Sequence, residues 1–481
     1  MRLTPSRAVL AALLLLSPAV PLALAQDSAP PAEPSIEAPS SEPSAAPSSE
    51  PSTEPSSEEP EAEEAPPEPP RKPRTDAEIY RDLAFFGEVF DRIREQYVDA
   101  PDEQTLLRAA INGMLTSLDP HSGYLDPKTF EDVQEDTSGQ FGGLGIEVTM
   151  EEGIIKVVSP IDDTPAQKAG VLANDYIVEL DGKSVQGMLL DDAVKLMRGP
   201  VGSKIKITVV REGAAEPLYF ELARAVISQR VTRYTMEGDV AVLRIARFTE
   251  QAYPGLAKAI NDIYAERKGT PPKGIILDLR NNPGGLVEQA EMVSDAFLSQ
   301  GVLLLTRGRG EDAATRTVAK PDDVDARLAD VPVIVLINGG SASASEIVAG
   351  ALQDHKRATV VGTRSFGKGS VQSIIHLGSN GGIKMTTARY YTPSNRSIQA
   401  AGIRPDIEVT EVVPEEYGDR FDVMGEAGLS GQIGGGTEEQ ATTRSSVYVP
   451  ADKAADTQLQ YAIRLILGTE THEAFPPKAE E

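Results

Sequence analysis

Two stretches in the first part of the folded chain have the three- and four-residue spacing of apolar positions that is typical of an amphipathic helix. The first covers residues 76–97, and the second covers residues 103–118 and stops before the turn-rich Asp119-Pro120. In the first stretch the apolar stripe consists of Leu83, Phe86, Phe90, Ile93 and Tyr97. We therefore expect a helical region over residues 76–139, whose apolar stripe meets another helix or another subunit.

Residues 140–225 have a different pattern, in which short β-branched runs alternate with turns. Runs at 154–158, 176–180 and 204–210 predict strands, and residues 189–197 have helical spacing. A glycine-rich segment opens the region, and by itself it would be read as an ordinary loop. Its residues are Gly142, Gly143, Leu144, Gly145 and Ile146.

The order of elements in residues 140–225 resembles a PDZ domain. In such a domain the glycine-rich loop binds the C-terminal carboxylate of a peptide through backbone N–H groups, while the peptide adds to the sheet as a strand. The resemblance implies that residues 142–146 form the peptide-binding loop.

Strands and helices alternate over residues 226–410. Strands are predicted at 240–245, 274–279, 302–306 and 333–337, with helices at 253–266 and 286–298. This alternation indicates a βαβ architecture with a largely buried sheet. We expect the charged residues 322–330 to form a solvated connection. Residues 411–481 are predicted to be a C-terminal tail, loosely structured through Thr443 and ending in an amphipathic helix at 457–467.

The N-terminal end of the chain has the features of a secreted protein. A positively charged start, an apolar run at residues 8–24 and the small residues Ala23-Leu24-Ala25 predict a signal peptide over residues 1–25. Retention of this run as a single membrane anchor is the alternative. We expect an exported protein, with the periplasm as its compartment.

Residues 26–75 are predicted to be a disordered acidic linker. Residues 26–70 contain twelve acidic side chains and no basic one, in a sequence of Pro, Ser, Ala and Glu that cannot bury enough apolar surface to fold. The linker supplies much of the net charge of -27, so this charge describes the folded part poorly. Nothing in the sequence indicates binding of nucleic acid.

The segment Asn338-Gly339-Gly340 joins an apolar strand to a predicted helix, and three serines follow it. Ser343 would lie where the strand becomes the helix, next to backbone N–H groups that have no helical partner. These groups would suit the oxyanion of an acyl-transfer intermediate. The alternative is that Ser343 merely caps the helix, because Ser343 and Glu346 have the spacing of a capping box.

A lysine between two glycines, Lys368, is the candidate base for this serine. A buried lysine can have its pKa lowered far enough to accept a proton from a hydroxyl. The chain contains four histidines, none in a pattern that assigns it a catalytic role, and no cysteine, so thiol nucleophiles and thiolate metal sites are excluded. Alone, a Gly-Lys-Gly turn would be read as a surface loop.

A second turn carries two glycines at the end of a predicted strand. Residues 278–285 read Asp-Leu-Arg-Asn-Asn-Pro-Gly-Gly, and a predicted helix follows. Backbone N–H groups in such a turn can approach a substrate carbonyl closely. The turn therefore offers a second oxyanion donor, although it is also compatible with an ordinary strand-to-helix connection.

Taken together, these motifs resemble the C-terminal processing peptidases of bacteria, over nearly all of residues 80–406. The motifs include residues 118–122, 141–146, 278–285, 340–346, 365–372 and 402–406. The resemblance implies an α/β fold, with a crotonase-like protease core, N-terminal helices and an inserted α+β PDZ domain. The roles that it implies are Ser343 as nucleophile, Lys368 as general base, Gln372 as the residue orienting the lysine, and Ala344, Gly284 and Gly285 as backbone oxyanion donors.

The resemblance also implies a function. We expect a serine endopeptidase without metal or cofactor that cleaves proteins near nonpolar C-terminal tails, with the PDZ domain binding the tail. An adaptor protein and a homo-oligomer are further expected partners, and Arg198 is a candidate regulatory residue that couples peptide binding to the active site. The alternatives are a catalytically silent PDZ scaffold and, on the shared fold alone, an acyl-CoA enzyme.

Overall fold

The computed structural model describes residues 74–151, 153–310, 313–434 and 444–478. The described residues fall into two units, residues 74–81 and the residues from 82 onward. The predicted signal peptide and all but the last two residues of the predicted linker lie outside the described residues. Within the described ranges, no helix combines the length and the apolar character needed to cross a membrane.

The helical region contains the two predicted helices and a third that the sequence did not predict. Helices α1 (Asp76–Gln96) and α2 (Glu103–Thr116) are followed by strand β1 (Gly123–Leu125) and helix α3 (Pro127–Ser138). Asp126 caps α3, Pro127 is its first residue, and Gly139 ends it with φ +64°. These end signals define α3, and none of its residues is buried.

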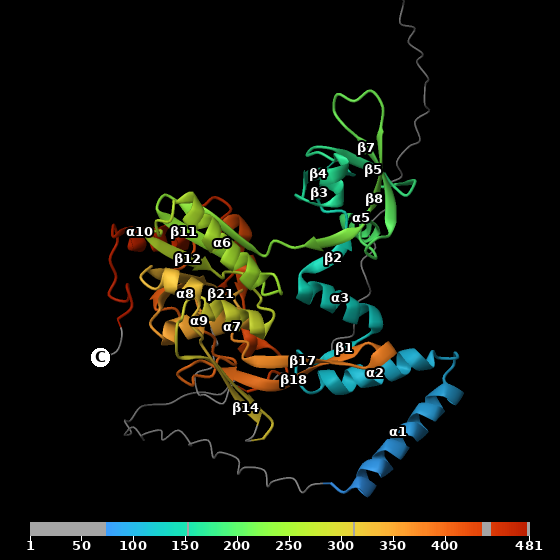
Figure 1. The fold of residues 1–481 in the computed structure, drawn as a ribbon. Helices are drawn as coiled ribbons and strands as arrows, with labels where there is room; N and C mark the ends of the chain where they lie inside the picture. The colour runs from blue at the N-terminus through green and yellow to red at the C-terminus, as the bar shows by residue number, and fades with distance from the viewer. Residues whose placement is uncertain (1–73, 152, 311–312, 435–443, 479–481) are drawn as a thin grey trace, which may run out of the picture. The chain divides into compact units, whose positions relative to one another are not determined.

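Residues 140–228 form a small α+β domain with its own core. Strands β2 (Gln140–Gly143) and β9 (Ala225–Ser228) pair at its start and end. Its main sheet has the order β3-β4-β5-β7-β8, with the short β6 beside β5 (Figure 1). The remaining elements are β3 (Ile146–Glu151), β4 (Ile154–Pro160), α4 (Pro165–Ala169), β5 (Tyr176–Leu180), β6 (Lys183–Ser184), α5 (Leu190–Met197), β7 (Lys204–Val210) and β8 (Leu218–Ala223).

A six-stranded sheet forms the core of residues 226–410, the predicted α/β region. Its order is β10-β11-β12-β15-β16-β19, and every neighbouring pair except β10-β11 is parallel. The carboxyl ends of β12 and β15 therefore meet at one edge of the sheet, where α/β proteins commonly place their sites. The strands are β10 (Thr232–Glu237), β11 (Val240–Ile245), β12 (Gly274–Asp278), β15 (Val333–Ile337), β16 (Ala358–Gly362) and β19 (Ile407–Glu408).

Helices cover both faces of this sheet, since alternate residues of each strand point to opposite faces. On one face Leu277 and Val335 pack with α6 (Ala252–Glu266), α7 (Val287–Asp295) and α9 (Ala344–Asp354). On the other face, the neighbouring strand residues Ile276 and Leu336 pack with α10 (Thr457–Leu467). The predicted βαβ architecture is thus present.

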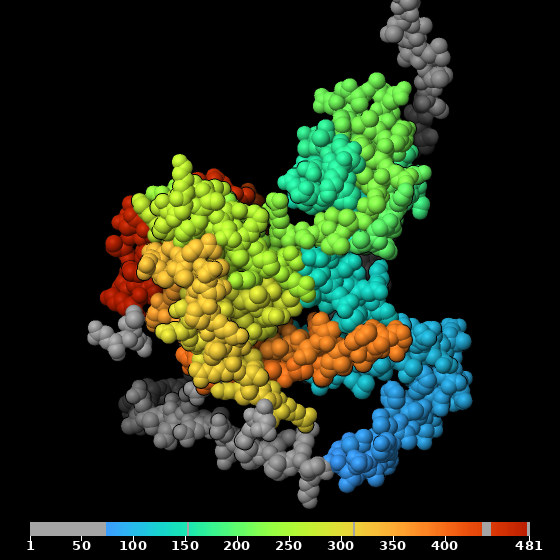
Figure 2. Space-filling model, in the orientation of Figure 1, coloured from blue at the N-terminus to red at the C-terminus, as the bar shows by residue number. Residues whose placement is uncertain are grey.

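A second, antiparallel sheet connects the α/β region to the helical region. Its order is β1-β18-β13-β14, with β17 paired to β18. The β17-β18 hairpin, orange in Figure 2, contacts the cyan residues around β1, and Tyr124 pairs with Ile383. The strands are β13 (Val302–Gly308), β14 (Ala314–Val318), β17 (Ser370–His376) and β18 (Gly382–Tyr391), with the short helix η2 (Gly378–Asn380) between the last two.

The charged residues 322–330 contain a helix, so their prediction as a solvated connection was wrong. Helix α8 (Asp323–Leu328) begins at a capping box between Asp322 and Asp325, and it buries Val324 and Leu328. Two apolar residues among many charges gave too weak a periodicity to predict it.

The prediction of a loosely structured tail was also wrong for the described residues. Beyond β19 the chain forms η3 (Glu415–Phe421), β20 (Asp422–Val423), η4 (Glu426–Gly428) and β21 (Ser445–Ser446) before α10. The apolar stripe of α10, including Leu459 and Ile463, is buried against the core sheet. By contrast, Leu83, Phe86 and other apolar residues of α1 are exposed.

Candidate active site

Ser343 lies in a strained turn between β15 and α9. Its φ is +55°, a conformation that side chains other than glycine rarely adopt. Every residue of α9 from Ala344 to Gln353 is buried, and the Ser343 side chain is itself only slightly accessible. The surrounding core thus fixes a turn that would be unfavourable in isolation.

The three serines of this turn differ in what their hydroxyl groups bind. The Ser341 hydroxyl donates to the carbonyl of Leu279 over 2.8 Å, and the Ser345 hydroxyl donates to the carbonyl of Asn282 over 2.8 Å. In the described part of the chain, the Ser343 hydroxyl donates to no carbonyl. Ser341 and Ser345 therefore attach the turn to residues 279–282, whereas Ser343 does not.

The capping box suggested by the sequence is present. The Ser343 N–H donates to Oε2 of Glu346 over 2.7 Å. A capping serine accepts a hydrogen bond at its hydroxyl oxygen, which leaves the hydroxyl proton free. Capping and nucleophilic roles for Ser343 are therefore compatible.

The turn at residues 278–285 lies against Ser343. A Cβ atom on Gly284 would be 2.7 Å from the Cβ of Ser343 and 2.9 Å from the Ala344 nitrogen. The Gly284 N–H already donates to Oδ1 of Asn282 over 2.9 Å. Among the described residues, the N–H groups of Gly285 and Ala344 have no acceptor. Of the three predicted oxyanion donors, Gly285 and Ala344 are thus the two that remain free.

Lys368 lies in the loop between β16 and β17 and is mostly buried. Burial lowers the pKa of its ammonium group, and the nearby positive charge of Lys384 lowers this pKa further. The negative charges of Glu426, Glu346 and Asp119 oppose the shift. A lysine with a lowered pKa is suited to accept a proton, which is what the sequence-based role requires.

The backbone of the lysine loop is attached to the serine turn, but the side chains of the two residues are not. The Phe366 N–H donates to the carbonyl of Ser341 over 3.0 Å. Within the described ranges, neither Ser343 nor Gln372 forms a hydrogen bond with the Lys368 ammonium group. The Gln372 amide instead donates to Oγ of Ser370 over 3.0 Å and to Oγ1 of Thr386 over 3.2 Å. The structure thus places Gln372 on the neighbouring strand β17 without the predicted bond to the lysine.

Glu346 links the serine turn and the lysine loop, a role that the sequence analysis did not assign. Its Oε2 accepts from the N–H groups of Ser343 and Lys368 over 2.7 and 2.9 Å. Its Oε1 accepts from the Ser365 hydroxyl over 2.6 Å and from the Gly367 N–H over 2.7 Å. Burial raises the pKa of this carboxyl group to about 7, although the four hydrogen bonds favour its ionised form. The capping-box motif was the signal for this contact.

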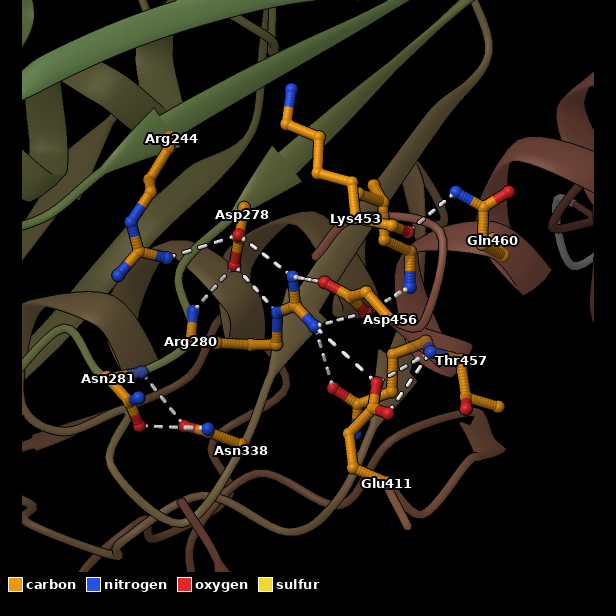
Figure 3. Close-up of polar contacts among 12 residues, drawn as sticks. Arg244, Asp278, Arg280, Asn281, Asn338, Glu411, Lys453, Asp456, Thr457 and Gln460 are labelled. Atoms are coloured by element: carbon orange, nitrogen blue, oxygen red, sulfur yellow. Dashed lines mark hydrogen bonds and ion pairs between the residues drawn. The ribbon is translucent and has the colours of Figure 1, made fainter. Parts of the chain in front are cut away.

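A buried arginine anchors the glycine turn to the C-terminal part of the chain. The Arg280 guanidinium donates to Asp456 through two nitrogens, both over 2.8 Å, and to Oδ1 of Asp278 over 3.0 Å (Figure 3). Glu411 approaches the same guanidinium at 3.8 Å. Burial and ionic contacts of this kind make removal of one partner costly. The residues before Gly284 are therefore held in place by charges on β12 and at the start of α10.

The predicted peptide-binding loop lines a groove of about 170 Å³ in the small domain. Gly142 does not line it; a Cβ atom there would lie 2.1 Å from the Gly199 carbonyl oxygen, so its glycine serves close packing. Arg198 lies at the groove with its guanidinium 4.0 Å from the centre of the Phe141 ring, and its buried Nε has no hydrogen-bond partner among the described residues. The groove is lined by Phe141, Gly143, Leu144, Gly145, Ile146, Val148, Ile161, Val194, Met197 and Arg198.

Comparison with known proteins places this arrangement in a family. The pattern of peptidase family S41 matches residues 239–409, the PDZ domain pattern matches residues 142–222, and the activating protease CtpB N-terminal domain pattern matches residues 50–129. A carboxy-terminal-processing protease of Bartonella bacilliformis is 52% identical over 398 residues, which cover 83% of this chain and 91% of that protein. This chain belongs to the carboxy-terminal-processing proteases.

Further relatives agree with the assignment of the protease. A carboxyl-terminal-processing protease of Synechocystis is 35% identical over 343 residues, covering 69% of this chain and 78% of that protein. A solved structure of a photosystem II D1 C-terminal processing protease aligns with a TM-score of 0.39 at 29% identity, covering 69% of this chain and 94% of that one. The sequence matches identify the protein as a serine peptidase with a PDZ domain, and its own strands and helices form an α/β fold. The prediction of this family is confirmed.

Proposed function

We propose that Ser343 is the nucleophile and Lys368 the general base of this protease. The observation that carries the proposal is the position of a largely buried lysine, with a lowered pKa, in a loop that is bonded to the serine turn. In the first step the Ser343 hydroxyl oxygen attacks the scissile carbonyl, and its proton passes to the neutral amine of Lys368. The side chains must first approach each other, and hydrogen bonds of this kind often tighten only when substrate is bound.

The free backbone N–H groups of Gly285 and Ala344 supply the second part of the proposed mechanism. They would donate to the oxygen that becomes negative in the tetrahedral intermediate. Collapse of the intermediate releases the amine, which takes the proton from Lys368, and water then hydrolyses the acyl-enzyme by the same route. We assign Gln372 the role of orienting Lys368 once substrate has brought the lysine to Ser343.

We further propose that the PDZ groove selects substrates by a nonpolar C-terminal tail. The groove combines the glycine-rich loop with apolar side chains such as Leu144 and Met197, which suits an apolar terminal residue. Arg198, at the rim of this groove and over Phe141, would report its occupancy to the catalytic region. The leader in residues 1–25 supports export, with the periplasm as the place of action.

One experiment tests the dyad and the tail preference together. The mature protease and its Ser343→Ala and Lys368→Ala variants are incubated with an unfolded protein that ends in an apolar tail, and again with that tail made polar. We expect cleavage only by the wild type and mainly of the apolar-tailed substrate. Equal cleavage by all three proteins would contradict the dyad, and indifference to the tail would contradict selection by the groove.

The role of Arg198 is tested by activation rather than by basal cleavage. A free peptide with an apolar C-terminus should accelerate cleavage of a second, tail-less reporter by the wild type. Arg198→Ala should remove this acceleration, while Arg198→Lys, which keeps the charge, reports how far the planar guanidinium matters. Unchanged acceleration in Arg198→Ala would exclude the proposed coupling.

A further inference from the structure

The C-terminal segment, residues 411–434 and 444–449, crosses the loops that form the active site. The Gly339 N–H of the serine turn donates to the carbonyl of Ser446, and the Asn281 amide of the glycine turn donates over 2.9 Å to the carbonyl of Val447. The Glu426 N–H donates over 2.8 Å to the carbonyl of Phe366, two residues before Lys368. This segment therefore contacts all three active-site loops, although it lies beyond residue 409, where the match to the peptidase family ends.

Glu426 is the buried charged residue at the centre of these contacts, and its side chain is 1% exposed. Both of its carboxylate oxygens lie 2.9 Å from Nε2 of His121, which is 305 positions away in the sequence. Its Oε1 also accepts over 3.0 Å from the amide of Gln399. The Gln399 side-chain oxygen in turn accepts over 2.9 Å from the Gly369 N–H.

These bonds hold the residues on both sides of Lys368. The Glu426 backbone binds Phe366, and the Glu426 carboxylate reaches Gly369 through Gln399. A buried carboxylate with this many partners is stable only while each partner is in place, so its position in turn restricts theirs. We propose that Glu426 is a positioning residue for Lys368, which holds the lysine loop in register with Ser343.

The charges around Lys368 give this positioning role a readout in the pH dependence of the enzyme. Glu426 raises the pKa of Lys368, as do Glu346 and Asp119, whereas Lys384 on β18 lowers it. His121 faces Glu426 from the segment before β1. Neutralising Glu426 alone removes one of the charges that favour the ammonium form, so the lysine would become neutral at a lower pH.

The proposal rests on the assignment of Lys368 as the base, and the test separates the two. The pH dependence of kcat and kcat/KM is measured for the full mature protease and for Glu426→Gln, with thermal unfolding as the check on folding. We expect the acid limb of the pH profile, where activity falls because Lys368 is protonated, to move to lower pH in Glu426→Gln. We expect its plateau kcat to fall about ten- to a hundredfold, because the lysine loop is less well positioned.

Two further variants separate the effect of the Glu426 charge from the effect of the bonds that hold the lysine loop. Glu416→Gln removes an exposed charge of the same segment and should match the wild type throughout. Gln399→Leu breaks the link to Gly369 while keeping the Glu426 charge, and should lower kcat without moving the limb. An unmoved limb in Glu426→Gln, or a wild-type kcat in Gln399→Leu, would overturn the inference. An inactive wild type would instead contradict the proposed function.

Discussion

The two halves of the active site are built in different ways. The serine turn is continuous in sequence, running from β15 into a helix whose first ten residues are all buried, and its two neighbouring serines are bonded to the glycine turn. The lysine loop is held through its backbone by residues from distant segments, namely Glu346, Gln399 and Glu426. Its charged side chain has no bonded partner within the described ranges.

This difference separates a fixed half from a half that remains adjustable. In our proposal the oxyanion donors and the nucleophile are in place before substrate arrives, which is what electrostatic stabilisation of a transition state requires. The base is buried beside them but is not bonded to the serine. On this proposal, substrate binding has to bring only the Lys368 side chain and its loop into the catalytic position. Variants in each half should therefore have different effects.

The largest effect is expected from removing the base. Lys368→Met keeps an unbranched apolar chain but cannot accept a proton, so kcat should fall by about 10⁴-fold or more. Lys384→Met is the matched control, because it removes a neighbouring positive charge that lowers the pKa of Lys368. It should move the acid limb to higher pH and leave activity at high pH intact. Retention of more than a few per cent of kcat by Lys368→Met would contradict the assignment.

A smaller loss is expected from disturbing the fixed half. Gly285 has φ +144°, and a Cβ atom there would lie 2.1 Å from the Phe248 carbonyl oxygen, so Gly285→Ala must displace the turn and its N–H group. We expect kcat to fall about 10²- to 10³-fold, the typical cost of losing one oxyanion donor. Gly269→Ala, at φ +84° with no atom within 4 Å, controls for backbone strain. Steady-state kinetics check both variants, and full activity of a folded Gly285→Ala would exclude this N–H group.

The sequence predicts the half of the site that is local in sequence better than the half that depends on contacts between distant segments. Ser343 and Gly285 lie in strand–turn–helix segments, which the local sequence pattern predicted, and the structure brings the two turns together. Their catalytic roles remain predictions. Glu346 was visible as half of a capping box, but its bonds to the lysine loop depend on tertiary contacts. The His121–Glu426 pair spans 305 positions and left no local signal. The glycine-rich composition around Glu426 instead predicted loose structure, because it says nothing about bonds to other loops.

The smallest effect is expected in the pH dependence of kcat/KM, through Glu346, which bonds to both the serine turn and the lysine loop. Glu346 has a pKa of about 7, and all four of its hydrogen-bonding neighbours are donors, so protonation below this pH must weaken one contact. Lys368 must also lose its proton. The acid limb of log kcat/KM should therefore have a slope above one, and Glu346→Gln, with lower activity, should return it to one. A wild-type slope of one would contradict this coupling.

The contribution of Glu346 to stability should fall as the pH rises, whereas activity should increase over the same range. The pKa of Glu346 is raised by folding, so the folded state binds the proton more tightly than the unfolded state does. The contribution of Glu346 to the free energy of unfolding is therefore fully present at acid pH and is lost as the pH rises from about 4.5 to about 7. Thermal unfolding of the wild type and Glu346→Gln over this range measures the difference, which should shrink as the pH rises.

Covalent labelling of the nucleophile tests the central claim most directly. A fluorophosphonate probe is reacted with the mature protease across a range of pH, and peptide mass mapping identifies the modified residue. The Ser343–Lys368 dyad predicts a single label on Ser343, a rate that rises with pH, no label in Ser343→Ala and very slow labelling in Lys368→Met. A label on Ser341 or Ser345, or an unchanged rate in Lys368→Met, would contradict it.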